Sequence, residues 1–361
     1  MLFELPTVSI IVFAYEGIAY LPATLNSILQ QTYTNYEVLV FSENYPRLPE
    51  CLRHQLNSRL KFICQRNLGI ASTLNQGVNA ARGRYISLLL PGDLWHPNKL
   101  QMQVLCLERH GDVGLIHSWL LLINRQGNFI GEIIKHQDSD WVKRKILTYD
   151  RIALSSVMIR RTCFEVVGWF DSKLQTIPDW DLWLRLNDRY RFMIVPETLV
   201  YCRKYQTRIA ENFLVAETDL QTIIEKAYAR ETFPRLEPKN RTYGRTSLFL
   251  AAKVIQSKAP DPAIVDNYCH QALQHYPSLG LSLEFLRLRL ALIALYCLKG
   301  DRYKRLLQLV RSAGYLLRLT IHKVGEYIQR LIQWMLEEED SIAFWKPRKG
   351  KIRNPELGKQ K

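Results

Sequence analysis

Short apolar runs alternate with amphipathic stretches along the first part of the chain. The runs are rich in β-branched and aromatic residues, which indicates buried strands. In the stretches between them apolar residues recur every three or four positions, as on one face of a helix. We expect strands at 8–13, 38–41, 61–64 and 85–90, and helices at 21–31 and 71–81. This rhythm predicts an α/β domain with a parallel sheet, in which ligands bind at the carboxyl ends of the strands.

The pattern then changes from mixed to helical. A helix at 98–110, a strand at 113–123, a turn at Gly127-Asn128 and a strand at 129–134 continue the first domain. After about residue 206 strand signals vanish, and helical periodicity predicts helices at 211–230, 246–257, 262–275, 282–298 and 302–336. We therefore expect an α/β domain at 1–206, an all-helical region at 207–340 and a basic, flexible tail at 341–361.

Composition places the chain among globular proteins. With 361 residues, 47% of them hydrophobic and 23% charged, two domains are expected. The seven cysteines are scattered and form no CxxC pair, which argues for reduced thiols in the cytoplasm and against a disulfide framework or zinc site. The first residues do not resemble a secretory signal. The apolar stretch 286–298 contains Arg287 and Arg289 and is too short to span a bilayer.

Positive charge widens the range of partners without choosing among them. The net charge of +15 suits nucleic acid, anionic lipid or nucleotide phosphates. No helix-turn-helix, RRM-like or zinc-finger pattern accompanies the charge, so we expect no nucleic-acid partner. The tail at 341–361 carries seven Lys or Arg against one Glu. This tail is either simply solvated or attracted to an anionic membrane surface or lipid-linked substrate, which would place the protein peripherally at the inner face of the membrane.

Four further segments occur in a characteristic order: 67–75, 80–87, 90–100 and 178–185. Together with the first strands, from about residue 6 to about residue 205, they resemble the inverting family-2 glycosyltransferases. The resemblance implies a GT-A fold, a nucleotide-sugar-binding, Rossmann-like mixed sheet flanked by helices. It implies transfer of a sugar from a nucleotide-diphosphate donor, a UDP-sugar above all, to a hydroxyl of a glycan or lipid-linked acceptor. Products of that kind belong to cell-surface polysaccharide or glycan biosynthesis.

The catalytic residue that the resemblance implies is Asp179. Relatives carry an acidic pair here, followed by an aromatic residue and a helix with an arginine; this chain keeps Asp179, Trp180 and Arg185 but has Pro178 in place of the first acid. Asp179 would act as general base on the acceptor hydroxyl. Trp180 and Asp181 would lie beside the acceptor sugar. The alternatives are that Asp179 is only a helix N-cap and that Asp181 only serves the first helical turn.

The metal motif of the family is incomplete. Relatives hold a divalent cation with an Asp-any-Asp stretch, where this chain has Leu90, Gly92 and a single acid, Asp93. Asp93 and the donor diphosphate could hold Mg²⁺ or Mn²⁺ only weakly. Lys204 stands about where relatives place a histidine. We expect Lys204, with Arg203, to stabilise the leaving diphosphate in place of the cation; the alternative is a surface lysine in a basic loop.

Nucleotide contacts are expected at the ends of the strands and in the segment that follows the third strand. By resemblance the candidates are Ala14, Tyr15, Glu16, Ser42, Glu43, Asn67, Gly69, Asn75 and Asp93. Tyr15 would stack on the base or belong to the core. Where relatives have an acidic pair after the second strand, this chain has a serine and a glutamate, so the nucleotide preference is poorly determined.

Two other classes of function stay open at this point. The lost acids motivate a degenerate relative that binds nucleotide-sugar or glycan without turnover. The long helical region motivates an interaction protein, although no repeat period supports it. The GxSxG, HExxH, GxGxxG and P-loop motifs are absent, which disfavours serine hydrolases, zinc proteases, and dinucleotide or ATP enzymes.

Overall fold

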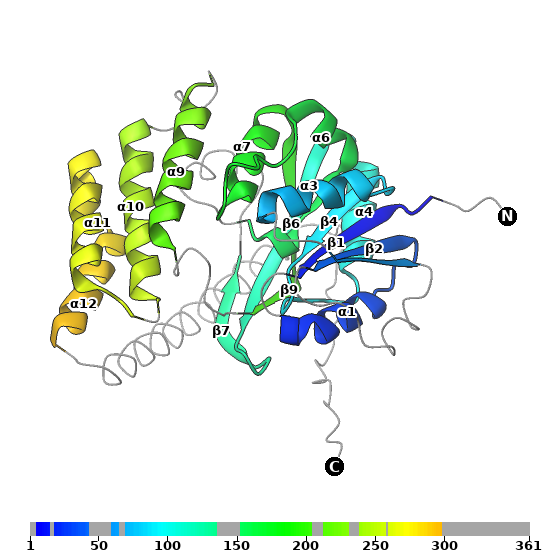
Figure 1. Ribbon diagram of the computed structural model, residues 1–361, viewed down its shortest axis with the longest axis horizontal. Coiled ribbons are helices and arrows are strands. Elements are labelled where there is room, and N and C mark those ends of the chain that lie inside the picture. Colours follow the sequence, from blue (N-terminus) through cyan, green and yellow to red (C-terminus); the bar gives the residue numbers. More distant parts are fainter. Residues whose placement is uncertain are drawn as a thin grey trace, which may run out of the picture. The chain divides into compact units, whose positions relative to one another are not determined.

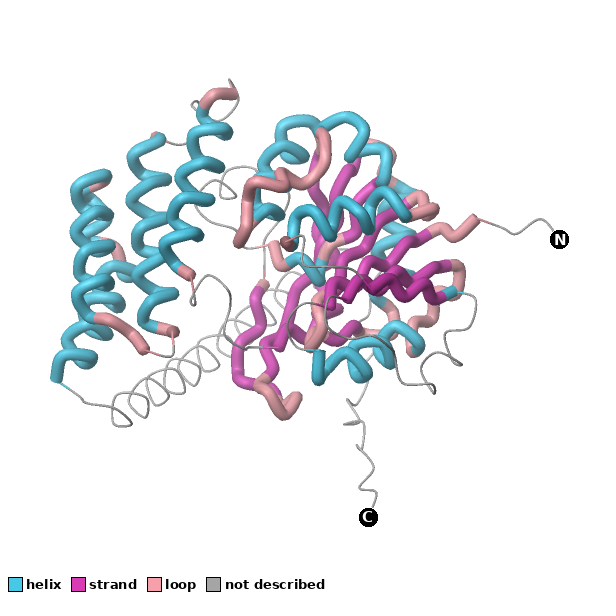
Figure 2. Tube along the Cα trace, in the orientation of Figure 1, coloured by secondary structure: helices cyan, strands magenta, loops and turns pink. Residues whose placement is uncertain are grey.

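A computed structural model describes residues 5–14, 18–42, 59–64, 69–135, 152–203, 212–230, 238–257 and 259–297 (Figures 1 and 2). All of them lie in one compact unit, Met1–Leu307. The expected helix at 302–336, the basic tail and the predicted domain boundary at 206 lie outside the described residues. Those three expectations therefore stay predictions.

A mixed sheet forms the centre of the α/β part of the chain (Figure 2). Among the described residues its strands are β1 (Val8–Ala14), β2 (Tyr36–Ser42), β3 (Leu60–Cys64), β4 (Tyr85–Leu89), β5 (Leu94–Trp95), β6 (Val113–Ile123), β7 (Phe129–Ile134), β8 (Met158–Arg160) and β9 (Arg191–Arg203). Their order is β3-β2-β1-β4-β8-β6-β9-β5, with β7 paired to β6.

The direction of pairing divides the sheet into a parallel half and a mixed half. Strands β1 to β4 pair in parallel, as the apolar runs predict. Strand β8 then pairs antiparallel with both β4 and β6, while β6 and β9 are parallel over most of their length. Strands β5 and β7 close the mixed half as antiparallel partners of β9 and β6. The parallel half aligns the carboxyl ends of β1, β2 and β4 at one edge.

Helices cover both faces of the sheet. They are α1 (Leu21–Leu29), α3 (Ile70–Ala80), α4 (Lys99–Arg109), α6 (Arg161–Val167) and α7 (Pro178–Arg189). Alternate residues of β1 enter two separate apolar clusters: Ile11 packs with residues of α3, α6 and α7, whereas Ile10 packs with residues of α1 and α4. This two-sided burial explains why the parallel strands read as continuous apolar runs instead of alternating ones.

A buried glutamate fastens one of these strands. Glu37 on β2 is 2% exposed and accepts hydrogen bonds from the Ser9 hydroxyl, the Arg82 backbone N–H and the Arg82 guanidinium at 2.7, 2.8 and 3.0 Å. Burial opposes ionisation of Glu37, but these bonds outweigh it and lower the pKa of the carboxyl below its ordinary value. The turn that leads into β4 is thereby tied to β1 and β2.

The helical region follows as α9 (Phe213–Tyr228), α10 (Lys239–Ile255), α11 (Pro262–His275) and α12 (Leu283–Cys297). The first three lie side by side in chain order, and α12 packs against both α10 and α11 (Figure 1). Helix α10 begins well before the start expected at 246, and Thr242 and Gly244 in its first turns are already buried. None of the described helices combines the length and the apolarity that crossing a bilayer requires.

Candidate active site

Helix α7 places Asp179 in its first turn. Pro178 is the first helical residue, which suits its fixed φ and missing N–H, and Ile177 occupies the N-cap without a capping side chain. The expectation that Asp179 caps the helix is therefore wrong: the helix begins one residue before it. Asp179 is half-buried, and its charge lies at the positive end of the helix dipole.

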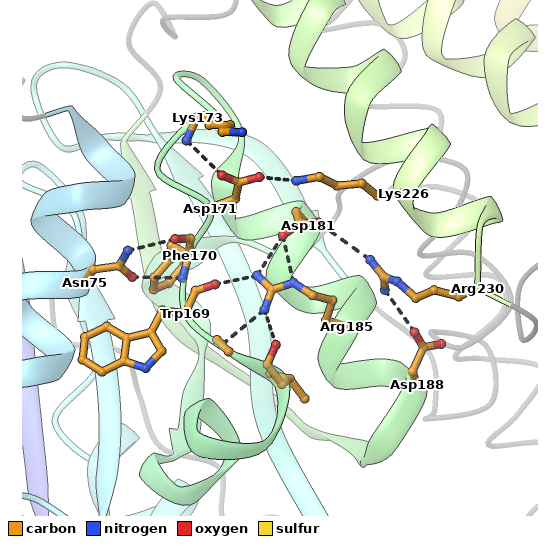
Figure 3. A network of polar contacts seen from close by, with 12 residues as sticks. Asn75, Trp169, Phe170, Asp171, Lys173, Asp181, Arg185, Asp188, Lys226 and Arg230 are labelled. Atoms are coloured by element: carbon orange, nitrogen blue, oxygen red, sulfur yellow. Dashed lines mark hydrogen bonds and ion pairs between the residues drawn. The ribbon is translucent and has the colours of Figure 1, made fainter.

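The neighbours of Asp179 point into the protein. Trp180 is 1% exposed and belongs to the apolar core, and Asp181 is 2% exposed. One carboxylate oxygen of Asp181 accepts from the Arg185 Nε and Nη2 groups at 2.9 and 2.8 Å (Figure 3). Side chains this deeply buried offer no face to a sugar, which corrects the expectation that Trp180 and Asp181 contact the acceptor. Their burial instead fixes the rotation of α7.

Arg185 also holds the turn that follows α6. Its Nη1 donates to the carbonyls of Val167 and Gly168 at 2.6 and 3.2 Å, and its Nη2 donates to the carbonyl of Trp169 at 2.7 Å. Gly168 ends α6 with a φ of 82°, a backbone conformation that favours glycine. The arginine of the sequence motif is thus a structural clamp between two helices.

Asn75, on α3, forms hydrogen bonds to the same turn from the side opposite Arg185. Its amide nitrogen donates to the Phe170 carbonyl at 2.8 Å, and its amide oxygen accepts from the Phe170 N–H at 2.9 Å (Figure 3). Each end of the amide binds backbone, while one N–H and one oxygen lone pair of Asn75 remain for another partner. Asn75 thus supports the segment before α7, and its expected nucleotide contact stays a prediction.

Asp93 is buried, whereas a metal ligand would need an accessible carboxylate. Its carboxylate oxygens accept from the Ser155 hydroxyl at 2.6 Å and from the Arg203 backbone N–H at 2.9 Å, and the residue is 3% exposed. Burial raises the pKa of Asp93 to about 6, while these hydrogen bonds oppose the rise. Divalent cations need several oxygen ligands. The described residues offer no group of three His, Cys, Asp or Glu side chains, so they do not fit a resident metal.

Arg203 closes the end of β9 and does not point to a free phosphate site. Its guanidinium donates to the carbonyl of Gly92 at 2.9 Å and to those of Asn124 and Arg125 at 2.9 and 2.7 Å, and it stacks 4.4 Å over the Tyr20 ring. The side chain is 7% exposed. The expected phosphate role of Arg203 is therefore corrected to fastening the turn around Gly92, while Lys204 lies outside the described residues.

The remaining nucleotide candidates occupy one edge of the parallel strands. Ala14 and Ser42 are register partners at the carboxyl ends of β1 and β2, and both are buried. Gly69 precedes α3 with a φ of 79°. Four candidates fall outside the described residues: Tyr15, Glu16, Glu43 and Asn67. Only the backbone around Ala14, Ser42 and Gly69 can thus be placed at this edge.

Sequence reasoning missed the residues that hold this edge together. The Thr24 hydroxyl on α1 accepts from the Gly92 N–H at 2.9 Å and donates to the Asp93 carbonyl at 3.0 Å. Ser155 bonds Asp93 as described above, and Asp219 on α9 binds the segment just before α7. Single serines, threonines and aspartates carry no periodic or spaced signal, because their partners come from distant parts of the chain.

Comparison with known proteins agrees with this architecture. The family model described as "Glycosyl transferase family 2" matches residues 9–162. An uncharacterized glycosyltransferase of Methanocaldococcus jannaschii is 29% identical over 217 residues, 58% of this chain and 73% of that protein. Chondroitin synthase of Escherichia coli is 27% identical over 250 residues, 66% of this chain but only 34% of that protein.

Two solved structures share the fold. TarS of S. aureus superposes with a TM-score of 0.52 at 14% identity, covering 75% of this chain and 49% of the TarS chain. A mannosyltransferase from Pyrobaculum calidifontis superposes with a TM-score of 0.51 at 18% identity, covering 90% and 88% of the two chains. The family match and these likenesses lead to one conclusion: residues 9–162 are similar to the family-2 glycosyltransferases, and the chain shares the fold of the two solved structures.

Proposed function

We propose that the chain transfers a sugar from a nucleotide-diphosphate donor to an acceptor hydroxyl with inversion, and that Asp179 is the general base. The observation that carries this proposal is the contrast within the first turn of α7. Asp179 is half-buried, whereas Trp180 and Asp181, which follow it in the same turn, are fixed in the interior. A carboxylate set on a clamped helix can be held in one direction, which general-base catalysis requires.

The chemistry is a single displacement. A carboxylate oxygen of Asp179 takes the proton of the acceptor hydroxyl as the hydroxyl oxygen attacks the anomeric carbon. The bond from that carbon to the diphosphate oxygen breaks, and the diphosphate leaves with the electron pair. We assign its stabilisation in part to Lys204, as a positively charged group can offset the developing charge. Arg203 is assigned a supporting role instead, because its Nε and Nη1 groups donate to backbone carbonyls.

The relatives support the donor and acceptor classes that we propose. The Pyrobaculum mannosyltransferase is in complex with GDP-Man and Mn²⁺, so nucleotide-sugars are the donors to test, and UDP-sugars are our first choice by family resemblance. The relative named chondroitin synthase supports a glycan acceptor in polysaccharide biosynthesis. The Asp93 carboxylate does not fit a resident metal, so no step is routed through one.

The decisive test is donor turnover. Purified protein is incubated with UDP-, GDP- and TDP-sugars, with Mn²⁺ or with EDTA, with and without oligosaccharide acceptors, and nucleoside diphosphate release is measured. Asp179→Asn should abolish release, whereas the control Asp112→Asn, a carboxylate 63% exposed, should leave it unchanged. Lys204→Ala should lower release most strongly in EDTA. Donor binding without release in the wild type would instead identify a non-catalytic relative.

We also propose a peripheral contact with an anionic membrane through α12. Leu283, Leu286, Leu290 and Ile293 are 70%, 47%, 67% and 55% exposed and recur every three or four residues along one side of the helix. An exposed apolar stripe on a protein of net charge +15 suits the surface of an anionic bilayer. Leu286→Glu with Leu290→Glu should abolish co-sedimentation with phosphatidylglycerol vesicles; equal binding by the variant would contradict the contact.

A further inference from the structure

A buried carboxylate of the helical region binds the backbone just before the catalytic helix. One oxygen of Asp219, on α9, accepts from the backbone N–H groups of Gln175 and Thr176 at 2.9 and 2.7 Å and from the Thr176 hydroxyl at 2.7 Å. Asp219 is 5% exposed. These bonds lie three and four residues before Asp179, where the chain enters α7 without any side-chain cap of its own. Asp219 therefore fixes the backbone that leads into α7, just before its N-cap residue Ile177.

Basic side chains of α9 and of the turn that follows it reach the same segment at three further points. Lys226 pairs with Asp171, in the loop before α7 (Figure 3). Arg230 binds Asp188 at 3.0 Å and approaches the buried Asp181 at 3.8 Å. Each of these basic groups pairs with an acidic group on α7 or in the loop before it. These pairs fix the position of α9 relative to α7.

Between these ion pairs, α9 and α7 also pack through apolar side chains. Leu220, Ile223 and Ile224 of α9 are at most 3% exposed and share one core cluster with Trp180 and Trp183 of α7. Buried cores tolerate little displacement, because their side chains interdigitate at high density. A shift of α9 would therefore be transmitted to the turn that carries Asp179. The helical region is built into the support of the active site.

We propose that α9 is a positioning element of the catalytic centre, and that Asp219 is the positioning residue that fixes the direction of Asp179. The inference rests on the proposed function, since it gives the helical region a role in the same reaction. Asp219 does not touch the substrate in this proposal. It acts through the Gln175–Thr176 backbone, and its loss should lower kcat while leaving the donor site intact.

A second carboxylate on the same helix provides a matched control. Glu217 accepts from the Tyr268 hydroxyl at 2.8 Å, which ties α9 to α11 and not to α7. Asp219→Ala and Glu217→Ala each remove one carboxylate that anchors α9, but only the first loosens the entry to α7. A general loss of helix stability would affect both variants alike, whereas a positioning role affects Asp219→Ala alone.

The experiment compares the full-length wild type with Asp219→Ala, Asp219→Asn and Glu217→Ala, using the nucleotide-sugar that gives the fastest diphosphate release. Misplacement of a catalytic group by about 1 Å can cost about 100-fold, so we expect Asp219→Ala to lower kcat by about 10- to 100-fold with donor KM changed by less than about 3-fold. Asp219→Asn keeps an acceptor oxygen and should recover part of kcat. Glu217→Ala should keep the wild-type kcat.

Hydrogen–deuterium exchange separates this inference from the proposed function. Asp219→Ala should raise amide exchange in the peptide at 172–183, whereas Glu217→Ala should not. If Asp179→Asn proves fully active, the proposed base is wrong, but the exchange and kcat effects of Asp219→Ala still report on positioning. The inference is overturned if Asp219→Ala keeps the wild-type kcat, if both alanine variants lose kcat equally, or if exchange at 172–183 is unchanged.

Discussion

Removing the Arg185 guanidinium tests how much the buried ion pair of α7 stabilises the folded protein. Arg185→Met keeps much of the apolar stem but leaves the Asp181 carboxylate, 2% exposed, without its two close hydrogen bonds. Arg230 stands 3.8 Å from the other oxygen and cannot replace them. The substitution also removes the donors to three backbone carbonyls after α6.

The magnitude follows from burial. Breaking a buried ion pair by removing one partner costs about 3–5 kcal/mol, because an unpaired charge stays in the interior. Such a loss is a large share of the 5–15 kcal/mol, roughly, that stabilises a typical folded domain. The exposed pair of Arg84 with Glu108, at 62% and 41% exposure, is the matched control. Arg84→Met should cost only about 0–1 kcal/mol.

Urea unfolding at neutral pH measures both variants, with tryptophan fluorescence as the signal because Trp180 and Trp183 are buried in α7. Adding Asp181→Asn to Arg185→Met should recover part of the lost free energy of unfolding, since it removes the stranded charge. The reasoning is refuted if Arg185→Met and Arg84→Met differ by less than about 1 kcal/mol, well short of the cost expected for a buried pair.

Three further outcomes test other parts of the structure. The pKa of Glu37 is lower in the folded state, so its ionised form stabilises the protein above the unfolded pKa near 4.5. In thermal melts the difference in melting temperature between the wild type and Glu37→Gln should therefore shrink as pH falls below that value. Gly83→Ala would place a Cβ 2.5 Å from the Ser9 backbone nitrogen, and the lowered melting temperature should correspond to about 1–3 kcal/mol or more. Asn75→Ala should lower kcat more than donor affinity, because it frees the Phe170 backbone; a loss of donor affinity alone, by calorimetry, would instead support the predicted nucleotide contact of Asn75.

Sequence reasoning predicted the residues of the candidate site less well than it predicted the fold. The base role of Asp179 stays a prediction, whereas Asp93, Asn75, Arg203 and Asp181 hold parts of the protein together. All four were selected because they match positions of a family motif. A motif gives residue types at a spacing, but it does not state whether a polar side chain faces the ligand or the neighbouring backbone.

Periodicity alone predicted a helix or strand where one face or both faces of a continuous segment are buried. The runs at 8–13 and 85–90 became β1 and β4, and the helical pattern at 262–275 became α11 with the same bounds. Strand β8 (Met158–Arg160) is too short to produce a period, and β9 (Arg191–Arg203) mixes buried with half-exposed positions, so periodicity predicts neither.

Only the tertiary structure decided which residues of the helical region bind the segment before α7. Asp219 and Thr176 are 43 residues apart, and no local pattern links an aspartate on one amphipathic helix to a turn before another. Burial strengthens such bonds, because an unpaired polar group costs far more in the interior than in water. The sequence determines the faces that each element must bury, whereas the positions of buried polar partners depend on how those faces meet.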